Sequence, residues 1–276
     1  MSAFLDAYFS RLGWTGPAEV NIDTLRALHL LHNGAIPFEN MDVLLHREIL
    51  LDEQALEEKL LHGRRGGYCF EQNGLFERAL KEVGFEVRSL LGRVVLSGPQ
   101  QMPPLTHRVL LVTLDGEQWL ADVGFGSQTL TAPIRLKEDD IQTTPHGTYQ
   151  LQREGDDWIL AFKHHDRWQP MYRFDRGQRY FSDYQMGNFW SANWPASHFR
   201  HHLIYSLHLA DGSKLTLNNF LFTHWTRNGE VAEQTTLPDA QALREVLATR
   251  FGVAVDGPRY GVTLNELAAV VPVNEG

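Results

Sequence analysis

Residues 112–119 read VTLDGEQW, and the Asp115-Gly116 pair in this stretch stands between two apolar segments with alternating polarity. An Asp-Gly pair flanked in this way is the strongest short-range signal for a two-residue β-hairpin. The turn also fixes the register of the two strands. If Leu114 faces Glu117, the numbers of paired residues always add up to 231.

This register brings a histidine and a carboxylate to one face of the hairpin. Asp122 is expected opposite Val109, and His107 opposite Gly124, which makes the two polar residues diagonal neighbours. Such neighbours lie about 7 to 8 Å apart, within reach of a long side chain. An unpaired carboxylate would be costly in the apolar run around Asp122, which favours a pair over the alternative of two solvated groups at a sheet end.

The chain has one cysteine, Cys69. A lone thiol cannot form an intramolecular disulfide and excludes a cysteine-rich zinc site, so it is either a small packing residue or a nucleophile. It follows Gly66-Gly67 at the start of a predicted helix, where the helix dipole and an adjacent imidazolium favour thiolate over thiol. His107 would then serve as the base, and Asp122 would orient its ring.

The periodicity of the chain changes near residue 85. Before it, the pattern predicts helices capped by Ser2, Asn21 and Asp52 and a fourth that ends at Gly84. After it, short segments typical of antiparallel strands follow, at 85–96, 108–114, 118–125, 158–162 and 171–174. The stretch 187–202 has no clear period; beyond it we expect a strand at 214–223, a helix at 239–251, and a last helix opened by a capping box at 263–266.

The composition limits the classes of partner. The 276 residues carry 25 Lys and Arg against 34 Asp and Glu, a formal charge of −9, so neither nucleic acid nor an anionic membrane surface is an expected partner. No apolar run is long enough to span a membrane, and the N-terminus lacks the features of a signal peptide. These features predict a soluble cytoplasmic protein.

The thirteen histidines raise the question of a metal site, above all His198, His201 and His202. Their spacing would place them side by side on a helix. No Asp or Glu lies nearby in the sequence to complete a set of ligands, so we expect no metal.

Three motifs carry a resemblance to a known family. RGGYCFEQN at 65–73, IPFEN at 36–40 and DVGFG at 122–126 closely resemble the arylamine N-acetyltransferases, the bacterial members in particular. The resemblance covers essentially the whole chain. It implies an α+β fold with a catalytic core like that of papain-like cysteine proteinases and transglutaminases.

The implied fold has three parts. They are an N-terminal helical bundle at 1–84 that carries the cysteine, a central antiparallel β-barrel-like domain at 85–202 that carries the histidine and the aspartate, and a C-terminal α/β lid at 203–276. A linker is expected near 187–202.

The resemblance also implies a reaction. Acetyl-CoA gives its acetyl group to the nitrogen of arylamines and arylhydrazines, and to the oxygen of N-hydroxyarylamines, by a ping-pong mechanism through acetyl-Cys69. The alternatives are a cysteine hydrolase or transglutaminase-like enzyme with the same triad, and a binding module in which the cysteine only packs. The sequence does not decide between a monomer and a homodimer.

Further site residues follow from the resemblance. The triad is Cys69, His107 and Asp122, and the residues placed in the acceptor pocket are Phe38, Val95 and Phe125. Glu39 and Arg65 are expected to form a structural ion pair beside the site. The resemblance implies coenzyme A as a co-substrate and implies no metal. The residues of the 124–129 loop, not the resemblance, suggest Gly126 and Ser127 as the place that receives its pyrophosphate, with a tight turn after the strand as an equal alternative.

Overall fold

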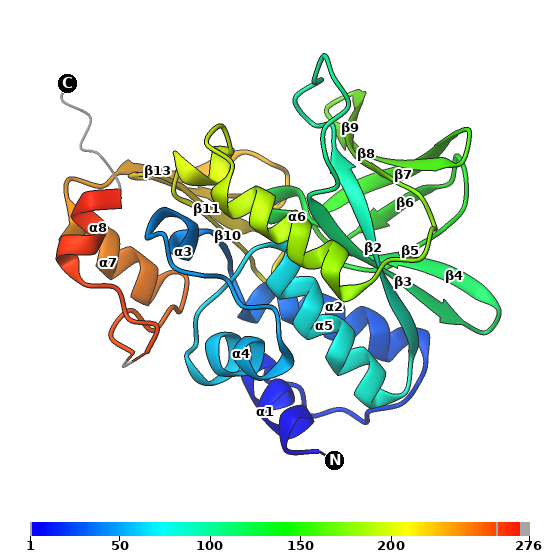
Figure 1. The fold of residues 1–276 in the computed structure, drawn as a ribbon, viewed down its shortest axis with the longest axis horizontal. Helices are drawn as coiled ribbons and strands as arrows, with labels where there is room; N and C mark the ends of the chain where they lie inside the picture. The colour runs from blue at the N-terminus through cyan, green and yellow to red at the C-terminus, as the bar shows by residue number, and fades with distance from the viewer. Residues whose placement is uncertain (1, 258, 271–276) are drawn as a thin grey trace.

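The N-terminal part of the chain is helical (Figure 1). The structure is a computed structural model that describes residues 2–257 and 259–270. Its helices are α1 (Ala3–Leu12), α2 (Ile22–Ala35), α3 (Met41–Leu44), α4 (Glu53–Glu57), which continues as a π-helical turn over Glu58–His62, and α5 (Cys69–Val83). The predicted caps are confirmed, because Ser2, Asn21 and Asp52 each accept a backbone N–H of the first turn. Gly84 ends α5 with φ of 112°, a left-handed conformation that glycine adopts at no steric cost.

An eight-stranded antiparallel sheet follows, curved into a near-barrel. In chain order its strands are β2 (Glu86–Val94), β3 (His107–Leu114), β4 (Glu117–Ala121), β5 (Ile134–Arg135), β6 (Ile141–Thr144), β7 (Gly147–Glu154), β8 (Asp157–His164) and β9 (Arg167–Phe174). Their order in the sheet is β5-β4-β3-β2-β9-β8-β7-β6. Helix α5 packs on this sheet through an apolar core shared with α1, α2 and strands β3 and β4.

The hairpin of β3 and β4 has the predicted register. Leu114 pairs with Glu117, and the ladder continues to Leu110 opposite Ala121. Asp115 and Gly116 have φ of 52° and 79°, the left-handed values that a two-residue hairpin turn requires. The turn chemistry of two residues therefore sets the register of the strands that position the site.

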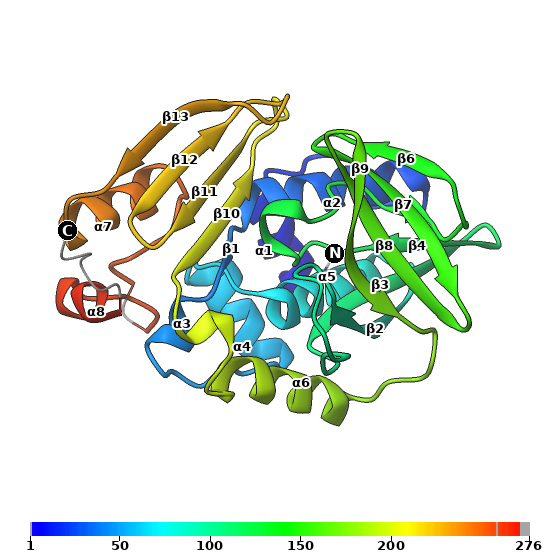
Figure 2. The same ribbon diagram turned by 90° about the horizontal axis from the view of Figure 1, so that it is seen from above.

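The second sheet combines the C-terminal part of the chain with a short N-terminal strand (Figure 2). Its order is β1 (Phe38–Glu39), β10 (Ile204–His208), β11 (Lys214–Asn218), β12 (Leu221–Trp225) and β13 (Val231–Thr236). Helices α7 (Ala240–Thr249) and α8 (Leu264–Val270) share an apolar core with this sheet. The capping box of Thr263 and Glu266 is present: the Thr263 N–H donates to Glu266 Oε2 at 2.8 Å, and the Glu266 N–H donates to Thr263 Oγ1 at 3.2 Å.

Two expectations about secondary structure are corrected. The single strand expected at 214–223 is a hairpin of β11 and β12, because Asn219 takes a left-handed φ of 52° between them. The stretch without a clear period, 187–202, contains the second half of helix α6 (Phe181–Asn193) and a 3-10 turn over His198–Arg200. Helix α6 shows no period because its buried face is built from Tyr184, Gly187 and Ser191, whereas several of its large apolar side chains are exposed.

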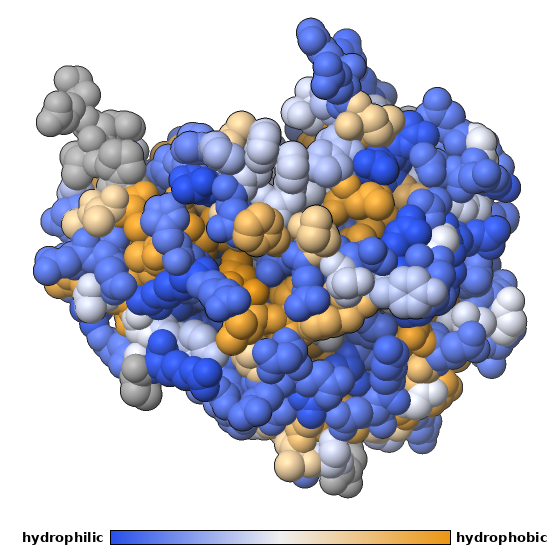
Figure 3. Space-filling model, in the orientation of Figure 1, coloured by the Kyte–Doolittle hydropathy of each residue, from blue (hydrophilic) through white to orange (hydrophobic). Residues whose placement is uncertain are grey.

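The assignment of this stretch as a linker remains a prediction. No helix within the described residues is both long enough and apolar enough to cross a membrane. Figure 3 shows apolar side chains gathered over α6 on the face of the molecule toward the viewer.

Candidate functional site

The start of α5 and the β3–β4 hairpin meet at Cys69. This residue is the first of α5 and is only 4% exposed. Its Sγ lies 3.6 Å from the carbonyl oxygen of Thr106, the residue before His107. The turn in front of the helix is fixed because the Tyr68 N–H donates to Glu71 Oε2 at 3.1 Å. The hairpin therefore docks on the first turn of the helix that carries the thiol.

Gly124 allows the segment after β4 to approach the start of α5 closely. A Cβ at this position would lie 2.7 Å from the Cα of Cys69 and 2.8 Å from Nδ2 of Asn73. Contacts of that length do not occur between real side chains and backbone, so only a residue without a Cβ lets the two segments approach. The first glycine of the DVGFG motif, Gly124, is a packing requirement of the site.

His107 and Asp122 form a buried pair. His107 Nε2 lies 2.8 Å from Asp122 Oδ2, and the two side chains are 3% and 0% exposed. The other carboxylate oxygen, Oδ1, accepts N–H groups from Asn73 and Gly124, both at 2.9 Å. Burial alone would raise the pKa of Asp122, but His107 and these donors lower it below its usual value. Asp122 is thus held as a carboxylate.

The same pair sets the charge of the imidazole. Burial alone would lower the pKa of His107, but Asp122 and, to a smaller extent, Cys69 raise it to about 10. The ring is therefore protonated at neutral pH. Because Nε2 binds Asp122, Nδ1 is the nitrogen left for the thiol. The rings of Phe125 and Tyr172 pack against the imidazole with centroids 4.9 and 4.7 Å away.

A buried cluster of charges supports the segments around the thiol. Arg65 binds Glu39 at 2.8 Å and Asp42 at 3.3 Å, and Lys59 binds Asp42 and Glu71, both at 2.6 Å. Burial works against ionisation of Asp42, but the two cations outweigh it and hold its pKa below its usual range. The structure thus joins Glu39 and Arg65, and it extends the expected pair to five groups. A cluster of this kind fixes geometry because loss of one partner leaves a buried charge unpaired.

The three residues expected in the acceptor pocket have different neighbours in the structure. Phe125 contacts the His107 ring directly. Phe38 shares a small apolar core with Cys69 and faces Gly126, where a Cβ would lie 3.6 Å from its ring. Val95 follows β2, and its N–H donates to Met171 O at 2.8 Å, one residue before Tyr172.

Gly126 and Ser127, the residues expected to bind coenzyme A, lie in a 3-10 turn that begins at the last residue of the DVGFG motif. Sequence reasoning missed the residue that binds this turn: Lys214 donates from Nζ to Ser127 O at 2.9 Å. Asn73, which donates to Asp122, is a second site residue that sequence reasoning missed, although it lies in the RGGYCFEQN motif. Its helical spacing from Cys69, four residues, could have placed it on the same face of α5.

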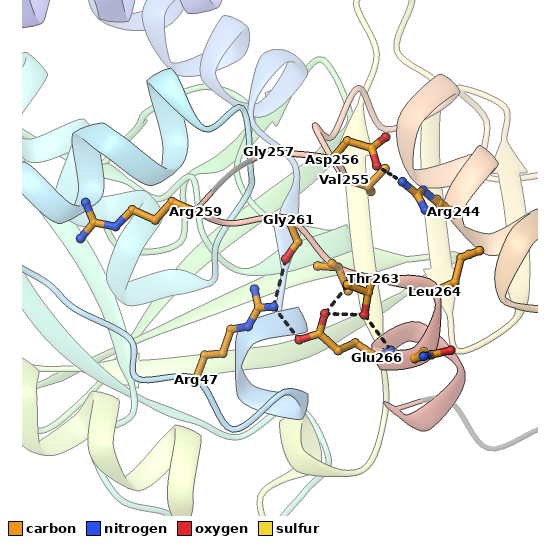
Figure 4. A pocket seen from close by; sticks show the side chains of 12 residues that line it. Arg47, Arg244, Val255, Asp256, Gly257, Arg259, Gly261, Thr263, Leu264 and Glu266 are labelled. Atoms are coloured by element: carbon orange, nitrogen blue, oxygen red, sulfur yellow. Dashed lines mark hydrogen bonds and ion pairs between the residues drawn. The ribbon is translucent and has the colours of Figure 1, made fainter.

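The pocket in Figure 4 lies apart from the His107–Asp122 pair. It has a volume of about 630 Å³ and is lined by Arg47, Arg244 and residues 255–257, 259 and 261–266. The cations there are paired, Arg47 with Glu266 at 2.8 Å and Arg244 with Asp256. None of the triad residues lines it. Within the described residues, moreover, no group of three or more His, Cys, Asp or Glu is arranged to hold a metal ion.

Gly124→Ala tests the docking of the hairpin. We expect a loss of about 1 to 3 kcal/mol of unfolding free energy in urea, because the new Cβ overpacks the contact with Cys69. Gly257→Ala is the matched control, since a Cβ at Gly257 would meet no atom closer than 3.7 Å. Equal losses in both variants would contradict the close approach.

The charge of His107 predicts a pH dependence of stability. A histidine with a raised pKa stabilises the fold fully below its usual pKa of 6.5, and this stabilisation is lost as the pH rises through about 10. The difference in unfolding free energy between the unmodified protein and His107→Gln should therefore shrink between pH 6.5 and pH 10. In an Asp122→Asn background the dependence should largely vanish; a difference that stays constant with pH would refute the charged pair.

Comparison with known proteins identifies the family. A family model described as "N-acetyltransferase" matches residues 21–260. The arylamine N-acetyltransferase of Escherichia coli (strain K12) is 64% identical over 98% of this chain and 96% of its own length. The arylamine N-acetyltransferase / N-hydroxyarylamine O-acetyltransferase of Salmonella typhimurium is 59% identical over the same shares.

Solved structures agree with the sequence comparison. The arylamine N-acetyltransferase structure from Salmonella typhimurium superimposes with a TM-score of 0.96 over 98% of both chains, at 59% identity. That of Mycobacterium marinum in complex with CoA gives 0.90 over 97% of this chain and 98% of the other, at 37% identity. Fold and sequence therefore agree that the chain belongs to the arylamine N-acetyltransferase family and is of its bacterial type.

Proposed function

We propose that this chain acetylates arylamines and arylhydrazines with acetyl-CoA, and N-hydroxyarylamines at oxygen, through a thioester on Cys69. The observation that carries the proposal is the thiol at the first position of α5 beside the buried, protonated His107 and its carboxylate partner Asp122. The relative from Salmonella typhimurium, which carries both activities in its name, supports the two classes of acceptor.

In the first half-reaction the Cys69 thiolate attacks the acetyl carbonyl. The tetrahedral oxyanion forms beside the first turn of α5, where backbone N–H groups near Cys69 and the helix dipole favour negative charge. The bond from carbon to the sulfur of coenzyme A then breaks. The His107 imidazolium gives its proton to the departing thiolate, which leaves acetyl-Cys69 and a neutral imidazole.

In the second half-reaction the amine attacks acetyl-Cys69. Neutral His107 takes the proton that the amine nitrogen loses, and the Cys69 thiolate leaves. The imidazolium and thiolate are thereby restored, and the product is the amide. Asp122 keeps its charge throughout and holds the imidazole in one orientation.

The aromatic rings around His107 suit an aromatic acceptor. Phe125 and Tyr172 contact the imidazole, and their ring centroids lie 5.2 Å apart. Flat apolar side chains of this kind bind aromatic rings by offset or edge contacts. We assign Phe38, Val95 and Phe125 to the acceptor pocket, and Phe125 has the most direct contact with the triad.

Coenzyme A carries phosphates, so its site on a chain of charge −9 needs a local cation. Lys214 supplies one beside the Gly126–Gln128 turn, and it forms no ion pair with a carboxylate of the described chain. Burial lowers the pKa of Lys214 because it disfavours the charged form of the side chain. A bound anion would offset this effect, so an anion is a favourable partner. The complex of the Mycobacterium marinum enzyme with CoA supports coenzyme A as a ligand of this fold.

The acyl-enzyme is directly testable. Incubation with acetyl-CoA in the absence of an amine should add the mass of one acetyl group, located on Cys69 by peptide mass spectrometry, and addition of an arylamine should remove it. Cys69→Ala is the control and should gain no mass. An adduct on another residue, or hydrolysis at the same rate with and without the amine, would overturn the mechanism in favour of a hydrolase.

Lys214→Met tests the cation. We expect the KM for acetyl-CoA to rise about tenfold, because a charge-assisted hydrogen bond is lost. Acetylation by p-nitrophenyl acetate, which carries no phosphate, should be unchanged. Lys163→Met, at an exposed position on β8, is the matched control; an equal effect with both donors would show that Lys214 only stabilises the turn.

A further inference from the structure

The segment that carries Asp122 is held at both ends by α2. We call residues 122–130 the Asp122 loop. At its start the Asp122 N–H donates to His29 Nε2 at 3.1 Å, and at its end Asn33 Nδ2 donates to Leu130 O at 2.9 Å. His29 and Asn33 are one helical turn apart and lie on the same face of α2, and both are buried.

His29 can accept the hydrogen bond from the Asp122 N–H only while its ring is neutral. A backbone N–H can only donate, so Nε2 must carry a lone pair. Burial lowers the pKa of His29 to about 3, against the opposing effect of Asp122, so the ring is neutral at ordinary pH. The ring of Phe76 stands nearly perpendicular to it, at 87° with centroids 5.5 Å apart, and the other titratable groups that act on it are Asp122 and His32.

Between its ends the Asp122 loop is held by hydrogen bonds among its own residues. Thr129 Oγ1 donates to Asp122 O at 2.7 Å and accepts the Phe125 N–H at 3.2 Å, while the Gly124 N–H binds Asp122 Oδ1. The position of the Asp122 backbone therefore determines where its carboxylate points. An apolar side chain in place of His29 would fill the space but leave a buried N–H without an acceptor.

We infer that His29 is a positioning residue of the active site: by accepting the Asp122 N–H it sets the carboxylate at the angle that turns the His107 imidazole toward Cys69. This inference rests on the triad roles proposed above. It assigns to α2, which contributes no member of the triad, control over the orientation of the base.

Two amide substitutions separate positioning from packing. In His29→Gln the amide oxygen reaches the place of Nε2, whereas in His29→Asn it reaches only the place of Nδ1. We expect His29→Gln to keep kcat/KM within about twofold, and His29→Asn to lower it about tenfold through kcat. The pH midpoint for alkylation of Cys69 by iodoacetamide should rise by about one unit in His29→Asn only, because a poorly held imidazolium stabilises the thiolate less.

Leu28→Ala is the matched control, since Leu28 is a fully buried neighbour on α2 whose apolar side chain cannot form a hydrogen bond with the loop. It should lower the melting temperature and leave the alkylation midpoint unchanged. The inference is overturned if His29→Asn has the midpoint of the unmodified protein, or if Leu28→Ala shifts it equally. Acetylation of Cys69 in the unmodified protein tests the triad itself, so failure there is distinguishable from failure of the His29 role.

Discussion

The carboxylate of Asp122 is the group on which the geometry of the site depends. It is fully buried, and such a charge is stable only if its lone pairs are satisfied. Its two oxygens accept from His107, Asn73 and Gly124, so one side chain binds the β3 strand, helix α5 and its own loop. The sheet and the helix must meet at one relative position for these bonds to form together. That position is the one in which thiol and imidazole are neighbours.

The local features of the fold could be predicted from the sequence because short-range chemistry determines them. Asp115-Gly116 sets the hairpin register, and the caps at Ser2, Asn21 and Asp52 set where helices begin. Helix α6 could not be found by its period, because its buried face holds Gly187 and Ser191 beside Tyr184 while large apolar side chains are exposed, which gives no amphipathic pattern. The hairpin at Asn219 was missed for a similar reason, since Asn-Asn between two apolar runs is a weak turn signal.

The site was predictable only where register or motif placed its residues. Counting along the hairpin brought His107 beside Asp122, and the motifs added Cys69. The contacts of His29 and Lys214 depend on how distant elements pack, across 93 and 87 positions of the chain respectively. Neither spacing nor composition of α2 or β11 distinguishes these two residues from ordinary core or strand positions.

The pairing of β1 with β10 has a consequence for synthesis on the ribosome. Phe38 pairs with Ser206, more than half of the chain away, and also forms a bridge with Gly67 just before the thiol. The edge of β1 therefore stays open until β10 (Ile204–His208) has emerged, since non-local pairing must wait for its partner strand. A nascent chain that has emerged through Asp122, directly after the β3–β4 hairpin, already contains all three triad residues. The turn before Cys69 is bridged to β1 through Gly67 and Phe38, and the sheet on the other side of β1 can be completed only after β10 has been synthesised.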